Sequence, residues 1–223
     1  MNNLYPKLFI LLLLTITINS CKPDPALYPT RVVPIPGYKG DDAGTNTGTY
    51  YFKGTLDGQA LNWQETTGVD GWVVGSAAAT SNDQGNITGN LSALLSAAKT
   101  LQPSVAVEIG TFHVLADADK SVVFNSFVTT GSWAFGTENN AIDARYVTIS
   151  YTDSEGNFYT SAKGAQTGTV NIVSVTPVPK EPGKEEGLKI KLTFSCTLYP
   201  EEGSGASLTL TNAETTLWFE NGL

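Results

Sequence analysis

The 223-residue chain has a net charge of −8, from 13 Lys and Arg against 21 Asp and Glu. Nucleic-acid binding needs basic residues that neutralise phosphates, so this composition argues against a nucleic-acid partner. No run of basic residues occurs either, which argues against a polybasic contact with a membrane surface. The length suits one well-filled hydrophobic core and is short for two.

The first 20 residues predict an export signal. Lys7 supplies a small positive region, and residues 8–18 are apolar apart from two threonines, which is the length of a signal core and short for a membrane span. The small residue Ser20 then precedes Cys21. This order resembles the bacterial lipoprotein signal, which implies cleavage before Cys21 and a diacylglycerol on its thiol. An uncleaved anchor or an ordinary signal peptide are the alternatives.

Residues 21–48 are predicted to be a lipidated tether, with five prolines in the first half and several glycines in the second. The lipid would make the membrane a partner of the chain. The resemblance implies an outer-membrane location. Lys22 and Asp24 partly match the export signal of surface lipoproteins, which favours the cell surface over the periplasmic face.

From residue 49 to residue 223 the hydrophobic pattern has a period of two, which predicts strands. A turn at Asp57 and Gly58 predicts a first hairpin, and residues 153–157 predict a second turn. Further strands are expected at 72–79, 104–109, 145–151, 169–175, 207–211 and 215–219. Many short strands with glycine-rich turns predict an all-β fold, a single antiparallel, jelly-roll-like β-sandwich domain.

Two segments have a less regular pattern. Residues 90–100 fit either a short helix or a strand that continues from Ile87 and Thr88. Residues 121–128 fit a helical turn across one end of the sandwich. Neither segment has the length of a long amphipathic helix.

Three short motifs resemble those of outer-membrane lipoproteins of Bacteroidota. They are Phe52 to Trp63 around Asp57-Gly58, Val147 to Ser161 around Asp153 and Gly156, and Phe194 to Tyr199 followed by Leu208 to Ala213. Ala213 stands where the family usually has glycine. The resemblance implies a jelly-roll-like sandwich of unknown function, adhesin-like in some members, and it transfers no catalytic residues.

Few residues offer catalytic or metal-binding chemistry. His113 is the only histidine, and no nucleophile motif accompanies it. If Cys21 is acylated, Cys196 has no partner, and it lies on the apolar face of an alternating segment, so we expect a buried thiol. Asp153, Glu155 and Asn157 are the best calcium candidates, but a hairpin turn explains them equally. We therefore expect no catalytic residues, no metal and no cofactor.

Aromatic residues out of phase with the core are candidates for stacking on sugar rings. Trp63 and Trp218 are expected in the core. The candidate ligand-binding residues are Trp72, Trp133, Tyr146 and Tyr159, with Tyr51 as a further exposed aromatic. The sequence thus favours a noncatalytic, surface-located binding module for a glycan or a protein. The alternatives are a structural subunit of an envelope or fimbria-like assembly and, third, a glycan-processing enzyme.

Overall fold

A computed structural model describes residues 49–66, 71–83, 85–137, 145–180, 185–201 and 205–221. The predicted signal peptide (1–20), the lipidation site Cys21 and the tether (21–48) lie outside the described residues. These three interpretations therefore stay predictions.

The described residues form an 11-stranded sheet and two short helices. In chain order the elements are β1 (Tyr51–Leu56), β2 (Gln59–Gln64), β3 (Trp72–Asp83), β4 (Asn86–Ala97), β5 (Ser104–Val114), α2 (Lys120–Phe127), β6 (Gly131–Phe135), β7 (Tyr146–Thr152), β8 (Phe158–Thr160), the 3₁₀ helix η2 (Ser161–Lys163), β9 (Val170–Val178), β10 (Gly187–Pro200) and β11 (Leu208–Glu220).

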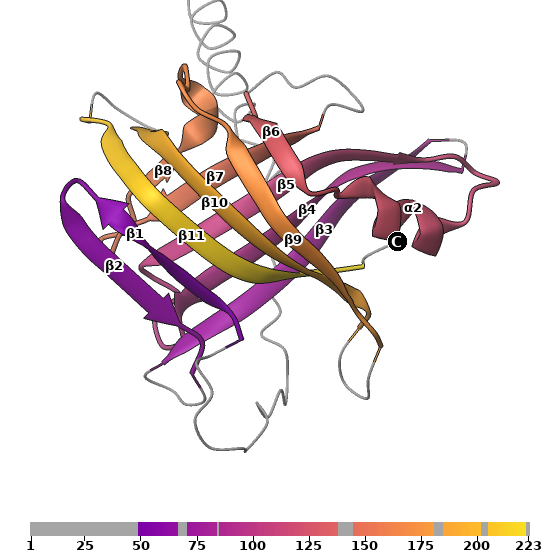
Figure 1. Ribbon diagram of the computed structural model, residues 1–223, viewed down its shortest axis with the longest axis horizontal. Helices are drawn as coiled ribbons and strands as arrows, with labels where there is room; N and C mark the ends of the chain where they lie inside the picture. The colour runs from indigo at the N-terminus through magenta and orange to yellow at the C-terminus, as the bar shows by residue number, and fades with distance from the viewer. Residues whose placement is uncertain are drawn as a thin grey trace, which may run out of the picture. The chain divides into compact units, whose positions relative to one another are not determined.

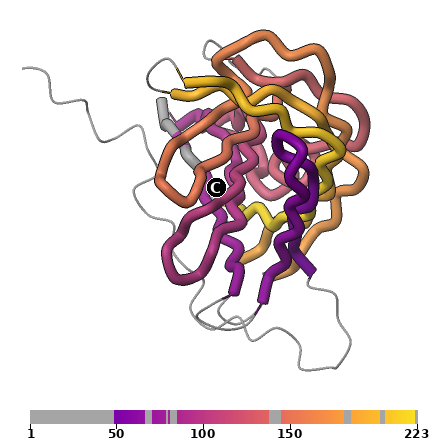
Figure 2. The backbone as a smooth tube through the Cα atoms, turned by 90° about the vertical axis from the view of Figure 1, so that its left-hand side faces the viewer, coloured from indigo at the N-terminus to yellow at the C-terminus, as the bar shows by residue number. Residues whose placement is uncertain are grey.

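The sheet folds over on itself to make two layers. The strand order is β2-β1-β11-β10-β9-β6-β7-β5-β4-β3, and the short strand β8 pairs with both β7 and β10. β9, β10 and β11 cross in front of β3, β4 and β5 (Figure 1), and β11 contacts β3 and β4. Figure 2 shows the β1–β2 hairpin, in indigo, beside the yellow C-terminal strand with which β1 pairs. The predicted all-β sandwich is confirmed.

One strand pair departs from the antiparallel pattern. Ala134 and Phe135 of β6 pair in parallel with Tyr146 and Val147 of β7, whereas β6 is antiparallel to β9. β6 therefore links the two layers at one side. β8 links them again, because Tyr159 faces both Tyr151 of β7 and Pro200 of β10.

The core lies between the layers and follows the predicted alternation. Along β10 the inward side chains are buried and those between them are more exposed. Cys196 is among the buried ones, and burial raises the pKa of its thiol to about 12. A neutral buried thiol is not a nucleophile. Cys196 is thus a core residue, as predicted, and so are Trp63 and Trp218.

Local signals account for most of the element boundaries. Asp57 and Gly58 have φ angles of 46° and 84°, which makes the predicted tight hairpin turn. Residues 90–100 are the strand alternative, since β4 buries Leu91, Ala93 and Leu95 against β5. The predicted helical turn is α2, and the Asp119 carboxylate caps it by accepting a hydrogen bond from the Val122 amide at 3.2 Å.

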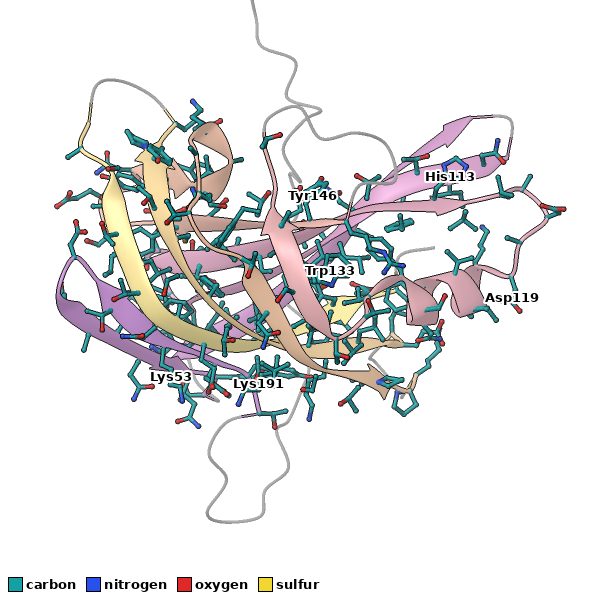
Figure 3. The ribbon with its side chains drawn as sticks, turned by 45° about the horizontal axis from the view of Figure 1, so that its top comes forward. Lys53, His113, Asp119, Trp133, Tyr146 and Lys191 are labelled. Atoms are coloured by element: carbon teal, nitrogen blue, oxygen red, sulfur yellow. The ribbon has the colours of Figure 1, made fainter. Side chains whose placement is uncertain are left out.

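An ion-pair network stabilises the outer face of the layer that contains β1, β10 and β11. Glu214 of β11 accepts a hydrogen bond from the Tyr51 hydroxyl at 2.7 Å and lies 2.8 Å from Lys53 Nζ and 3.2 Å from Lys191 Nζ. Figure 3 shows the two lysines on the same side of the sheet. The hydrogen bonds from Lys53 and Tyr51 lower the pKa of Glu214 to about 2.

This network predicts a pH-dependent contribution to stability. The folded pKa of Glu214 is below its ordinary value of 4.5, so the contribution is complete above pH 4.5 and is lost as the pH falls towards 2. Solvent screens the network, so we expect Glu214→Gln to lower the free energy of unfolding by about 1 kcal/mol at pH 7. Urea denaturation from pH 7 to pH 2.5 measures this difference. A difference that stays constant with pH would contradict the prediction.

Candidate ligand-binding surface

Trp133 is buried, so its predicted exposure is wrong. It retains 5% of its accessible surface. Its indole lies on β6 against Phe127 of α2, edge to face at 5.9 Å, and its Nε1 donates a hydrogen bond to the Thr129 carbonyl at 3.0 Å. The indole therefore packs in the core against α2 and has no exposed face on which a sugar could stack.

Tyr146 is also buried, with 7% exposure, and its predicted exposure is wrong for a different reason. A Cβ atom on Gly110 would lie 2.3 Å from the Tyr146 hydroxyl oxygen, and one on Gly136 would lie 2.5 Å from the ring, so two glycines leave the space that this side chain fills. Its hydroxyl donates to the Glu108 carboxylate at 3.1 Å. The ring therefore packs within the β5–β6–β7 region.

The other two candidates, Trp72 and Tyr159, belong to one line of aromatic rings, which we call the aromatic row and define as Trp72, Trp63, Tyr151 and Tyr159. The Trp72 and Trp63 rings are stacked, with centroids 4.2 Å apart and planes at 14°. Trp63 and Tyr151 follow at 6.3 Å and 21°, and Tyr151 and Tyr159 at 6.2 Å and 36°. Trp63 is buried, and the other three rings are partly exposed.

Strands from both layers position the aromatic row. Trp63 comes from β2 and rests on Phe52 at 5.4 Å, whereas Trp72 begins β3. The Trp72 amide donates to the Thr66 hydroxyl, and the Thr66 amide donates to the Trp72 carbonyl, both at 3.0 Å. A Cβ on Gly71 would lie 1.7 Å from the Thr66 hydroxyl, so this close approach requires glycine. The Trp72 backbone is therefore held rigidly.

Polar groups border the row at the turn after β7. Asp153 accepts hydrogen bonds from the amides of Glu155 and Asn157 at 2.9 Å and from Asn157 Nδ2 at 2.7 Å. Burial acts to raise the pKa of Asp153, but these hydrogen bonds outweigh it and lower the pKa. Burial, with Asp153 and Tyr159, raises the pKa of Tyr151. At neutral pH the turn therefore offers a carboxylate acceptor beside a phenolic donor.

The other candidates for chemistry lie apart or serve structure. The bonds of Asp153 account for the 153–157 cluster as a hairpin turn, and among the described residues no group of three or more His, Cys, Asp or Glu side chains is arranged for a metal ion. His113 pairs with Thr88 near the Asn86 end of β4, whereas Trp72 pairs with Ala97 at the opposite end. Tyr51 binds Glu214 on the outer face, away from the row.

Sequence reasoning missed that the row includes Tyr151 and Trp63. Both residues lie in phase with the core, so the alternating pattern assigns them to the interior. Their position near strand ends was the available signal, since Tyr151 stands two residues before the turn at Asp153. Rings near strand ends lie at the edge of the core between the two layers rather than at the centre of the core.

No protein-family model, curated protein or solved structure matches this chain. Within the part of the chain that the structure describes, no helix has the length and apolar character needed to cross a membrane.

Proposed function

We propose that this chain is a noncatalytic, lipid-anchored protein of the outer membrane whose sandwich domain binds a saccharide on the aromatic row. The observation that supports this function is the set of three partly exposed rings, Trp72, Tyr151 and Tyr159, held in line by the buried ring of Trp63. Aromatic faces are suited to the C–H faces of sugars, and pre-aligned rings lose little entropy on binding.

Each part of the row would have its own role. A sugar ring would stack on the face of Trp72 opposite Trp63. The phenols of Tyr151 and Tyr159 would donate hydrogen bonds to sugar hydroxyls, and the Asp153 carboxylate would accept one. The large exposed apolar side chains are scattered over different elements, which supports a sugar ligand over a broad apolar protein interface. They are Leu101, Leu115, Val122, Phe158 and Val173.

A glycan array tests the proposed function. The purified full chain is applied in a detergent without a sugar headgroup, so that the detergent does not compete. Binding to a defined set of saccharides is the expected result. No binding to any saccharide would contradict this function and would move the search to protein ligands.

The proposed anchor gives a separate prediction. Cys21→Ala removes the only thiol that the lipoprotein signal can acylate, so we expect an unprocessed precursor without covalent lipid. Radiolabelled palmitate incorporation and membrane fractionation measure this outcome. The matched variant Cys196→Ala should keep both lipid and membrane retention. Lipid incorporation into Cys21→Ala at the wild-type level would contradict the anchor.

One observation favours a structural subunit as a second candidate. β3 ends the strand order and pairs with β4 over its whole length without a register shift. Its sequence holds no Lys, Arg or Pro, which are residues that commonly protect strand edges. Another chain could add a strand there. Self-assembly of the purified chain in sedimentation experiments, without saccharide, would favour this candidate.

A further inference from the structure

A groove of about 260 Å³ lies between the end of β5 and α2, whereas Tyr151 of the aromatic row pairs with Val105 near the start of β5. Residues 111–113 of β5 form one wall, Val123, Ser126 and Phe127 of α2 form the other, and Arg145 lies at its border ahead of β7. The volume is slightly below the range of about 300–1,000 Å³ that drug-sized ligands occupy. The groove therefore suits one small molecule or one unit of a larger ligand.

Arg145 provides the positive charge of the groove. It is one of two arginines in a chain of net charge −8. Its guanidinium lies 5.8 Å from the centroid of the Trp133 ring, and its Nη1 donates to the Thr129 hydroxyl at 3.3 Å. Both contacts are with neutral groups, and no ion pair joins Arg145 to a carboxylate among the described residues. A planar guanidinium held in this way suits a carboxylate, which it can bind with two parallel hydrogen bonds.

The remaining lining divides into a polar and an apolar side. His113 Nδ1 lies 3.0 Å from the Thr88 hydroxyl, which orients the imidazole on the β5 side. Phe127 packs edge to face on Phe112 at 5.7 Å and makes an apolar wall. The Ser126 hydroxyl already donates to backbone carbonyls of α2, so it can only accept a further hydrogen bond. The donor to an anion therefore comes from Arg145.

We propose that this groove binds a small monocarboxylate, with the carboxylate at Arg145 and the body of the ligand against Phe127. The combination of one oriented guanidinium with an aromatic wall favours an organic acid over a neutral sugar. The acid could carry an apolar body or be a sugar acid, and both present the same carboxylate. This site is independent of the aromatic row and of the function proposed for it.

Ligand-detected saturation-transfer NMR on the purified full chain tests the proposal. Benzoate and glucuronate are the two acid probes, with benzyl alcohol and glucose as their neutral partners. We expect at least one acid to bind in the millimolar range or tighter, and about tenfold tighter than its neutral partner. Binding of benzoate would identify an apolar acid, and binding of glucuronate a sugar acid. No binding of either acid, or equal binding of acid and neutral partner, would overturn the proposal.

Variants of the groove locate the binding. Arg145→Gln should weaken acid binding about tenfold, and Arg145→Lys should weaken it less because the charge remains. The matched control Lys120→Gln removes a charge from α2 outside the groove lining and should leave the affinity unchanged. In the wild-type chain the acid should shift the indole N–H signal of Trp133 and leave that of Trp72 in place. Unchanged affinity in a folded Arg145→Gln variant, or a shift confined to Trp72, would overturn the assignment.

Discussion

Trp63→Ala is expected to lower the free energy of unfolding by about 3–5 kcal/mol, the cost of deleting a large buried ring. Trp63 retains 7% of its accessible surface and contacts Phe52 within its own layer. It also stacks on Trp72 and Tyr151 of the opposite layer. Its removal would leave a cavity where the two layers meet. Urea denaturation followed by far-ultraviolet circular dichroism measures the change.

The matched variant Trp63→Phe separates ring packing from general disturbance. Phenylalanine keeps an aromatic contact with Phe52 and part of the stack, so we expect a smaller loss than for alanine. Small domains have a total stability of about 5–15 kcal/mol, so the loss expected for the alanine variant is a large fraction of the total. A loss below about 1 kcal/mol for Trp63→Ala would contradict the role given to Trp63 in joining the layers.

Trp72→Ala is expected to weaken saccharide binding at least tenfold, which is about 1.4 kcal/mol of binding free energy. The reason is that Trp72 is the outermost ring of the row and has Trp63 on one face only. Because Trp72 is partly exposed, its loss should cost only about 1–2 kcal/mol of stability, and the variant should remain folded. Titration calorimetry with the best saccharide from the array measures the affinity.

Phe158→Ala is the matched control for this experiment. Phe158 is 38% exposed and neighbours Tyr159 on β8, with its side chain on the opposite face of the strand. The Phe158→Ala substitution removes an exposed aromatic ring close to the aromatic row and leaves the four rings of the row in place. Its affinity should equal that of the wild type. Equal affinities for the wild type and Trp72→Ala would contradict a binding role for Trp72.

Local patterns predicted the strands well because one face of each is buried. The Asp57-Gly58 turn set the register of β1 and β2, and alternation placed Cys196 in the core. The pattern failed where β11 was expected as two strands. β11 is continuous, and a register shift against β10 between Phe194 and Cys196 absorbs the irregularity at Asn212, whose φ is 51°. Such a bulge changes the phase of alternation without ending the strand.

The candidate site could be predicted only in part because burial at β6 and β7 depends on distant residues. Tyr146 is buried since Gly110 and Gly136 leave space for its ring, and Trp133 is buried since α2 packs over it. Neither cause is visible in the sequence next to these aromatics. Trp72 was identified because it lies out of phase with the predicted core, and in the structure it is the first residue of β3. The alignment of its ring with Trp63 and Tyr151 required the three-dimensional structure.

The most direct test of the central claim uses the four tryptophans as position markers. The indole N–H signals of the ¹⁵N-labelled full chain are assigned by single Trp→Phe substitutions and followed during titration with the best saccharide. Saccharide binding on the aromatic row predicts that the signals of Trp72 and Trp63 shift together, while those of Trp133 and Trp218 stay in place. A shift of Trp133 alone, with Trp72 unmoved, would place the saccharide at the groove beside α2 and contradict the proposed function of the row.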